Sequence, residues 1–490
     1  MKTRFFLGLM ALITAVFSLQ SCSDDDDNDA IIKVKGSYIN FTRDSVAIDA
    51  LPFQVSAGYA IIGIDCDGDW TAELADSSWA AISNHAGYGS TTKYSYVRVS
   101  VDRNMGDARS TFLTVNSGNV SKQLVINQAG TGLDAGDPFE SSYSFLNNIV
   151  LGYNLGNTLE SNHDITNENT LSWFNPQTVY DWETCWGQPV TTQPIIDAIA
   201  AKGFNVIRVP VTWFPHMDAN DNVEEAWMNR VQEVVDMVLK TGCYCIINVH
   251  HDASEYDPKR GDGAHWLQAD MEQYPVVSQR FKKLWTQIAN RFKGYDQHLL
   301  FEAVNEILDE TGNWGDPAKP AAYEAVNKLS QDFVDAVRAT GGNNEWRNLV
   351  VNPYSAGNSA AKLAGFQVPS DKHPNHILMS VHSYDPYGFC NDNGEWNVNI
   401  FDATCEKEIS DLVARVANRA DQLGVPFFFG EFGAIDENKS MSERIKYASF
   451  ITSELKNRGT TGLWWMGLID RNSLNWYEAE LVDALFKGMQ

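Results

Sequence analysis

The segments FEAVNE at residues 301–306 and FFFGEFG at residues 427–433 decide the fold of this chain. Each is a short apolar run that brings a glutamate to its end, Glu306 in the first and Glu431 in the second. A run of this length is typical of a buried strand. If both strands belong to one parallel sheet, their carboxyl ends meet at the same edge and deliver two carboxylates to one cleft.

Apolar runs of the same character recur from about residue 140 to the end of the chain. We expect eight strands, at residues 149–154, 206–209, 244–248, 299–303, 349–352, 377–381, 426–430 and 462–465. Longer amphipathic stretches such as 193–201, 227–240 and 276–292 separate them and are typical of helices. Gly203, Gly242 and Gly424 stand where a helix should end. The alternation predicts a (β/α)8 TIM barrel over residues 140–490.

The region before the barrel has a different sequence pattern, with short alternating runs and no helical period. Residues 31–130 contain alternating runs such as 94–101, 111–115 and 123–127, with turn residues between them. This spacing predicts an immunoglobulin-like β-sandwich. The motifs WTA at 70–72, SW at 78–79, RST at 109–111 and VINQAG at 125–130 resemble the BACON domain, which implies either glycan binding or a spacer. Residues 131–139 are rich in Gly, Asp and Pro and predict a linker.

The first residues of the chain predict a targeting segment. Lys2 and Arg4 precede an apolar stretch at 5–17 that is too short to span a bilayer as a mature helix. The following LQSC at 19–22 resembles a bacterial lipobox, which implies a signal peptide at 1–21 and a lipid on Cys22. Residues 22–30 form an acidic tether. We therefore expect an outer-membrane lipoprotein exposed at the cell surface, with a plain secreted protein as the alternative.

Composition excludes some partners and favours others. The formal net charge of −26 and a pI near 4.7 argue against nucleic acid, since little here would neutralise phosphates. The 15 tryptophans suit a neutral polysaccharide, because sugar rings stack on flat apolar side chains. No cysteine spacing is of the zinc type, and we expect no metal, no cofactor and a monomer. Whether Cys390 and Cys405 pair stays open.

Polar or aromatic residues follow almost every expected strand. We expect these residues to converge on one ligand, because burying each polar side chain without a partner would cost about 1–3 kcal/mol. The pair Glu306 and Glu431 fits a retaining glycosidase, in which one carboxyl donates a proton and the other attacks carbon. The remaining residues suit supporting roles: Arg208 keeping the nucleophile ionised, Asn305 binding the sugar 2-hydroxyl, Tyr384 donating to the nucleophile and Trp465 stacking on the sugar.

These positions also carry a family resemblance. The motifs NLGNT at 154–158, ETCWG at 183–187, GFNVIRVP at 203–210, NVHH at 248–251, NE at 305–306, VHSY at 381–384 and GEFG at 430–433 resemble glycoside hydrolase family 5, most of all its endo-β-1,4-glucanase and xyloglucanase branch. The resemblance implies Glu306 as acid/base and Glu431 as nucleophile. It implies a supporting and substrate-binding set of Arg208, His250, Asn305, His382, Tyr384 and Trp465, with Asn157, Glu160 and His251 as further sugar contacts.

The last strand departs from that pattern. Where the branch usually has Trp-Asp-Asn-Gly, the chain reads Trp465-Met466-Gly467-Leu468, so the Asp and Asn on that side are missing. The expected activity is endo-acting hydrolysis of a plant-type β-1,4-glucan such as xyloglucan, cellulose or mixed-linkage glucan. A β-1,4-xylanase or mannanase on the same scaffold is the alternative, and a non-catalytic glycan-binding lipoprotein is a further one.

Overall fold

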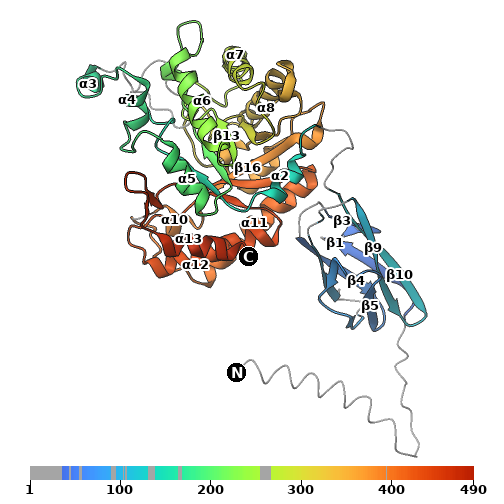
Figure 1. Cartoon of the computed structure of the whole chain (residues 1–490). Coiled ribbons are helices and arrows are strands. Elements are labelled where there is room, and N and C mark those ends of the chain that lie inside the picture. The colour runs from blue at the N-terminus through green and yellow to red at the C-terminus, as the bar shows by residue number, and fades with distance from the viewer. Residues whose placement is uncertain are drawn as a thin grey trace, which may run out of the picture.

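The computed structural model describes residues 36–490 except for 44–45, 54–57, 90–94, 103, 105–106, 131–137, 164–167, 254–265 and 393. The expected signal peptide, the lipid site at Cys22 and the acidic tether lie outside the described residues, as does most of the expected linker. The described chain forms a strand-rich N-terminal region and a larger α/β region (Figure 1). Within the described residues no helix combines the length and apolar character needed to cross a membrane.

The larger region is a closed barrel of eight parallel strands in chain order. The strands are β11 (Gly152–Asn154), β12 (Val206–Val209), β13 (Tyr244–Asn248), β14 (Leu299–Glu302), β15 (Leu349–Val351), β16 (Ile377–Ser383), β17 (Phe427–Phe432) and β18 (Gly462–Trp465). All eight expected strands are present, so the predicted TIM barrel is confirmed. Nearly every strand residue is buried, as expected when helices cover the outer face and side chains fill the interior.

Helices alternate with the strands and cover the barrel. They are α2 (Ser142–Asn148), α3 (Glu168–Leu171), α4 (Val179–Thr184), α5 (Gln193–Ala201), α6 (Glu225–Leu239), α7 (Tyr274–Arg291), α8 (Ala321–Ala339), α9 (Ala360–Gly365), α10 (Tyr387–Cys390), α11 (Ala403–Leu423), α12 (Met441–Asn457) and α13 (Ala479–Gly488). Gly424 ends α11 with a φ of 67°, a conformation that glycine adopts without steric cost. A short hairpin of β19 (Ile469–Asp470) and β20 (Asn475–Trp476) follows the last barrel strand.

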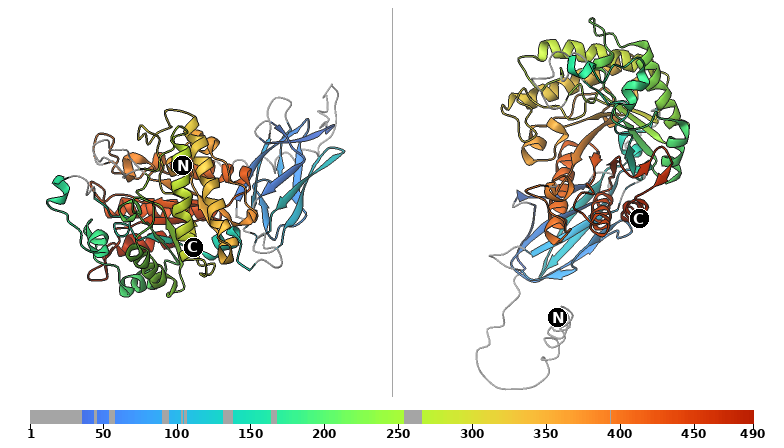
Figure 2. Two further views of the ribbon diagram at one scale, coloured as in Figure 1. Left: turned by 90° about the horizontal axis from the view of Figure 1, so that it is seen from above. Right: turned by 90° about the vertical axis from the view of Figure 1, so that its left-hand side faces the viewer.

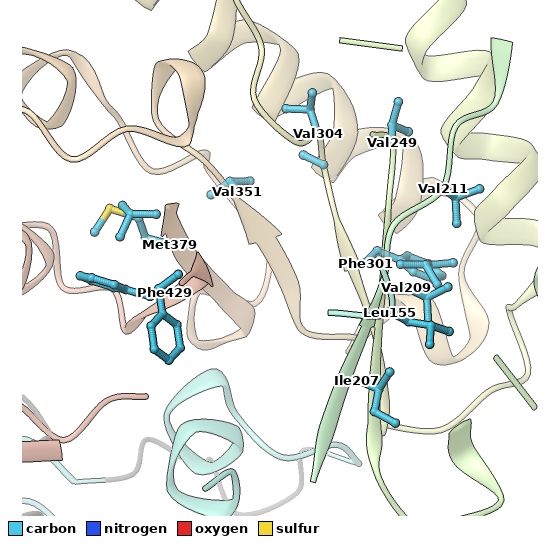
Figure 3. Close-up of a cluster of buried hydrophobic side chains, with 14 of the residues drawn as sticks. Leu155, Ile207, Val209, Val211, Val249, Phe301, Val304, Val351, Met379 and Phe429 are labelled. Atoms are coloured by element: carbon cyan, nitrogen blue, oxygen red, sulfur yellow. The ribbon is translucent and has the colours of Figure 1, made fainter. Parts of the chain in front are cut away.

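The main hydrophobic core lies between the barrel strands and the surrounding helices. Figure 3 shows part of it, with side chains such as Ile207, Val209, Phe301 and Phe429 pointing away from the strands that carry them. A second buried cluster fills the amino-terminal end of the barrel interior. There, Phe145 of α2 packs with residues from several strands, including Ile246 and Leu463. The short helix α2 therefore closes that end of the barrel, and the opposite end stays available for function.

The N-terminal region consists of two five-stranded sheets that share one core. One sheet holds β1 (Ile39–Arg43), β2 (Val46–Ala47), β4 (Gly58–Cys66), β6 (Ala80–Ile82) and β8 (Ser95–Val101). The other holds β3 (Ala50–Phe53), β5 (Trp70–Leu74), β7 (Ala86–Gly87), β9 (Arg109–Ser117) and β10 (Val120–Gln128). Both sheets bury alternate residues in a common cluster that includes Ile62, Val99 and Leu113. The expected strands at 94–101, 111–115 and 123–127 are confirmed with slightly different ends.

The N-terminal region lies beside the end of the barrel that α2 closes, and the segment with α3 and α4 lies at the far side (Figures 1 and 2). The two regions are in contact at Arg458, between α12 and β18, where the Arg458 guanidinium lies 4.3 Å from the centre of the Tyr59 ring. Cys390 and Cys405 are both free thiols, so the open question of their pairing is answered in the negative for this structure.

Candidate active site

The predicted site residues gather at the carboxyl end of the barrel. Glu431 belongs to β17 itself, and Glu306 follows the end of β14. A register shift between β16 and β17 accompanies Gly430, where a side-chain β-carbon would lie only 2.3 Å from the Ser380 hydroxyl. Such an irregularity re-aims the residues around it, and only glycine fits so close to the neighbouring strand. The local sequence therefore turns Glu431 into the mouth of the barrel.

The two glutamates face each other across that mouth. Ligand atoms of Glu306, His382 and Glu431 all lie within 4.8 Å of one another. The Glu431 side chain is 5% exposed and the Glu306 side chain 17% exposed, so both are largely shielded yet reachable. A separation near 5 Å is that of the two carboxyl groups in retaining glycosidases, and inverting enzymes need roughly 6.5–9.5 Å.

Arg208 lies beneath the two glutamates and holds the side chains around them by hydrogen bonds. Its fully buried guanidinium donates to Glu431 Oε1 at 2.8 Å, to Asn305 Oδ1 at 2.9 Å and to Asn154 Oδ1 at 2.9 Å. It also donates to Glu302 Oε2 at 2.6 Å. The two carboxylates outweigh the effect of burial, and the pKa of Arg208 is raised, so its charge is permanent.

Glu431 experiences opposing influences. Burial raises its pKa above the usual range, while the positive charges of His382 and Arg208 act in the opposite direction. Arg208 holds one of its oxygens, and the Tyr384 hydroxyl donates to the other, Oε2, at 3.0 Å. Hydrogen bonds from both sides stabilise the ionised form and fix the carboxylate in one orientation.

His382 links the two carboxyl groups. Its Nδ1 lies 2.8 Å from Glu306 Oε1 and 3.7 Å from Glu431 Oε2. Burial lowers its pKa, but the neighbouring Glu431 and Glu306 charges outweigh burial and raise it. A protonated Nδ1 donates to Glu306 and leaves Glu306 Oε2 as the oxygen able to carry a proton.

By distance alone, Glu306, His382 and Glu431 could hold a metal ion. A cation there would have to displace the hydrogen bond between His382 and Glu306, and it would stand close to the fixed charge of Arg208. The arrangement of charges therefore suits a proton shared among carboxyl groups better than a metal centre.

An aromatic wall borders the carboxyl pair. The Trp465 ring lies parallel to that of His250 at a centroid distance of 6.0 Å, and His251 meets His250 edge to face at 4.5 Å. Burial keeps the pKa of His250 well below its usual value, so this ring is neutral. Trp186, which the sequence singled out only as part of a motif, extends the wall at 5.3 Å from His251.

The predicted sugar contacts at Asn157 and Glu160 are placed differently. Glu160 has no exposed surface, and its oxygens accept from the backbone N–H groups of Asn157 and Thr158, the latter at 3.0 Å. Asn157 has a φ of 57°, and the hydrogen bonds from the loop backbone to the Glu160 carboxyl help to hold this conformation. The geometry favours a loop-positioning role for Glu160 over the predicted sugar contact. Asn157 is part-buried in the same loop.

Sequence reasoning missed the layer beneath the site. Glu302 is fully buried and accepts from Arg208, from Asn248 Nδ2 at 3.1 Å and from Asn352 Nδ2 at 3.1 Å. A charged residue inside an apolar strand was the available signal, because such a residue is rarely buried without a partner. Asn154 was quoted within a motif but given no role, and it joins Arg208 to the backbone of β17 and β18.

Comparison with known proteins identifies the barrel. A family model described as cellulase (glycosyl hydrolase family 5) matches residues 165–468. The chain belongs to glycosyl hydrolase family 5. A second model, described as the BACON putative N-terminal binding domain, matches residues 68–129.

Several family 5 proteins resemble the chain. Endoglucanase A of Clostridium longisporum is 35% identical over 71% of this chain and 66% of its own length, and cellulase/esterase CelE of Acetivibrio thermocellus is 33% identical over 71% of this chain. The chain thus spans just under two thirds of the first relative and 40% of the second. A xyloglucan-specific endo-beta-1,4-glucanase of Bacteroides ovatus is 28% identical over 98% of this chain and 96% of its own length.

Solved structures of the family show the same barrel. A family 5 enzyme of Prevotella bryantii, crystallised with a xyloglucan tetradecasaccharide, is 37% identical, with a TM-score of 0.65 over 72% of this chain and 99% of its own. A Bacteroides ovatus family 5 xyloglucanase in complex with a heptasaccharide covers 92% of this chain at 25% identity, with a TM-score of 0.63.

Proposed function

We propose that this chain is a retaining endo-β-1,4-glucanase whose main substrate is xyloglucan. The observation that carries the reaction class is the pair of carboxyl groups, Glu306 and Glu431, within 4.8 Å of one another at the mouth of a family 5 barrel. Support for the substrate comes from the Bacteroides ovatus xyloglucanase, which matches nearly the whole chain, including the N-terminal region.

The proposed reaction is a double displacement. Glu431, held ionised by Arg208 and Tyr384, attacks the anomeric carbon of the sugar. At the same time Glu306 donates its proton to the oxygen of the breaking linkage, and the far part of the glucan leaves as an alcohol. The first step leaves a covalent glycosyl ester on Glu431.

Water completes the cycle. Glu306, now ionised, takes a proton from a water molecule as that water attacks the same anomeric carbon, and Glu431 is released as a carboxylate. Because carbon is attacked twice from opposite faces, the configuration is retained. His382 donates to Glu306 in both steps and so stabilises the carboxylate that forms when Glu306 gives up its proton.

Substitution of the two glutamates tests this assignment. Glu431→Ala and Glu306→Gln should each lower hydrolysis by orders of magnitude, because each removes a group that acts in the chemical step. Glu406→Gln on the exposed face of α11 is the matched control and should keep full activity. Circular dichroism should show that all three variants are folded. Near-full activity in either active-site variant would refute the proposed roles.

A panel of polysaccharides tests the substrate. Release of reducing sugar should be fastest on xyloglucan, with slower release from carboxymethyl cellulose and mixed-linkage glucan. A xylanase or mannanase on the same scaffold is the second candidate, and faster release from xylan or mannan would establish it. Binding of glycans without release of reducing sugar from any of them would favour a non-catalytic glycan-binding protein.

We also propose that the chain is an outer-membrane lipoprotein, anchored through a lipid on Cys22 and exposed at the cell surface. The lipobox-like LQSC at 19–22 and the acidic run after it support this proposal. In a Gram-negative host, the wild-type chain should fractionate with membranes and Cys22→Ala should be released. Membrane retention of Cys22→Ala would reject the lipid assignment.

For the N-terminal region we propose an immunoglobulin-like sandwich that acts as a spacer, with glycan binding as the alternative. The two sheets and their shared core support the sandwich, and the position beside the closed end of the barrel supports the spacer. Affinity electrophoresis of residues 31–130 in gels containing xyloglucan separates the two, since only a glycan-binding domain is retarded. We propose that the enzyme acts as a monomer, which sedimentation velocity tests.

A further inference from the structure

A pocket adjoins the carboxyl pair on the side of β17 and β18. Its volume is about 410 Å3, within the usual range of small-ligand sites. Tyr384 and Trp465, which belong to the proposed site, line it together with Ile435, Met466 and Tyr477. The pocket is therefore continuous with the position of the sugar that is cleaved.

The unusual sequence after β18 helps to form this space. Gly467 lines this space without a side chain, and a β-carbon there would contact only the Tyr477 hydroxyl, at 3.7 Å. Gly433 also lines the pocket and contributes no side chain. The Trp464 indole donates to the Met466 carbonyl oxygen at 3.0 Å and fixes the course of the segment. Two residues that line the pocket, Gly433 and Gly467, therefore leave its space free of side-chain atoms.

The hydrogen bonds around Glu431 set the orientation of a bound sugar. Asn305, the proposed partner of the 2-hydroxyl, is joined through Arg208 to the Oε1 side of Glu431. Tyr384 donates to Oε2 on the other side. In a pyranose the anomeric carbon is flanked by C2 and the ring oxygen. With C2 toward Asn305, the ring oxygen and the C5–C6 arm point toward Tyr384 and hence toward the pocket.

The pocket walls suit a sugar unit. Trp465 and Met466, which are both part-exposed, provide apolar surface against which a pyranose ring can pack. Polar groups come from Asp436, Asn391 and the Tyr477 hydroxyl. Glu478 also lines the pocket; one of its oxygens accepts from Arg444 at 2.6 Å, and the other, although buried, has no hydrogen-bond partner among the described residues. A sugar hydroxyl is a donor that such an acceptor lacks.

We propose that this pocket binds a xylosyl branch on C6 of the glucosyl unit whose linkage is cleaved. The proposal rests on the proposed function and extends it. Here the C6 arm opens into a pocket lined by Tyr384, Trp465 and Gly433. The enzyme should therefore cut xyloglucan after branched glucose as well as after unbranched glucose.

Product analysis tests the proposal directly with the full chain. Xyloglucan is digested in water enriched in ¹⁸O, because the attacking water places its oxygen on each new reducing end. Tandem mass spectrometry then shows whether the marked glucose carries xylose. We expect marked ends of both kinds. If every marked end is unbranched glucose, the proposal is wrong, although the proposed function stands.

Blocking variants assign the effect to the pocket. Ile435→Trp or Asn391→Trp, each at a residue that lines the pocket, should lower the ratio of branched to unbranched marked ends about tenfold by filling the space. Val276→Trp on the exposed surface of α7 is the matched control and should leave the ratio unaltered. Branched ends that persist in both folded blocking variants would overturn the assignment to this pocket.

A linear substrate separates the two levels of the hypothesis. Mixed-linkage glucan has no branches, so its hydrolysis by the wild-type chain tests the proposed function alone. Hydrolysis of the linear glucan with only unbranched ends from xyloglucan rejects the branch pocket. Failure on every β-glucan rejects the proposed function, and the inference falls with it.

Discussion

At the scale of single residues, Arg208 has the greatest consequence. It is fully buried and balances two carboxylates, Glu302 below it and Glu431 above it. A buried charge that loses its partner is expensive, because water no longer solvates it. Arg208 therefore supports both the ionisation of the nucleophile and the stability of the barrel.

Replacing Arg208 by Gln should lower the free energy of unfolding by about 3–5 kcal/mol, because two buried carboxylates lose their cation. Urea denaturation at pH 7 measures this change. Lys407→Gln is the control, since Lys407 and its partner Asp411 are 75% and 60% exposed and their pair should contribute less than about 1 kcal/mol. A loss below about 1 kcal/mol for Arg208→Gln would show that the ion pairs of Arg208 with Glu302 and Glu431 stabilise the fold less than their burial implies.

The second prediction at this scale concerns Tyr384. Burial raises the pKa of Glu431, so activity should fall with decreasing pH at a value above that of an ordinary glutamate. The Tyr384 hydroxyl stabilises the ionised carboxylate. Tyr384→Phe should therefore raise the pKa of Glu431 further and move the acidic limb of kcat/KM to higher pH by about one unit. An unmoved acidic limb would contradict a role for this hydrogen bond.

The positions of the site residues could be predicted only where the sequence contained a chemical reason for them. Glu306 and Glu431 follow apolar runs, and their position at strand ends is visible in the sequence. Glu302 lies inside such a run, and its link to Arg208 spans 94 positions of the chain. A pairing of this kind depends on the closure of the barrel, which no local pattern contains.

At the scale of elements, the loop after β11 shows how a buried glutamate can hold a loop through hydrogen bonds to its backbone. Burial raises the pKa of Glu160 to about 7, against the lowering effect of the backbone N–H groups of Thr158 and Asn157. These donors would be left unpaired in a buried loop if the carboxyl were removed.

Glu160→Ala should therefore destabilise the protein, and the size of the effect should depend on pH. The pKa is higher in the folded protein than the value of 4.5 for an ordinary glutamate, so the contribution of the carboxyl is complete below pH 4.5 and falls as pH rises to about 7. The shift corresponds to about 3 kcal/mol. Thermal unfolding of both proteins from pH 4 to 8 checks this. If the difference in stability between the wild-type chain and Glu160→Ala widens as pH rises, the sign is reversed and the explanation is refuted.

Regular elements were the easiest part to predict. The strands at 206–209, 244–248 and 462–465 agree with the predicted bounds at both ends, since each is a continuous apolar run that helices cover. β16 and β17 extend beyond prediction because polar residues such as His382 and Glu431 still pair within the ladder. The short helices α3 and α4 were not predicted, because they lie in a long connection without a clear period.

At the scale of the whole molecule, the separation of the site from the N-terminal region leads to a further prediction. The region contacts the barrel near Arg458, between α12 and β18, and the site lies at the carboxyl ends of the strands. Deleting residues 31–130 should leave kcat and KM on a soluble xyloglucan oligosaccharide within about twofold of the full chain. Relatives solved as the barrel alone support independent folding.

The control for that deletion is the full chain assayed at the same molar concentration, with circular dichroism to verify the barrel. A tenfold or larger loss of kcat/KM would mean that the N-terminal region shapes the cleft.

The sequence predicted two regions and their boundary, but it could not place one against the other. That placement depends on single contacts, such as Arg458 with Tyr59, between residues about 400 positions apart.

The helix α2 has a practical consequence for where the catalytic unit begins. The match to the family model starts at residue 165, yet α2 and the residue before its cap, Glu140, already belong to the fold. Glu140 accepts a hydrogen bond from the Tyr244 hydroxyl at 2.7 Å, and its own N–H donates to Gln297 at 2.9 Å. A clone that started at the family boundary would lack both α2 and the barrel strand β11, so the barrel could not close and its amino-terminal end would lose its cover. An expression boundary upstream of Phe139 keeps both α2 and β11 in the expressed protein.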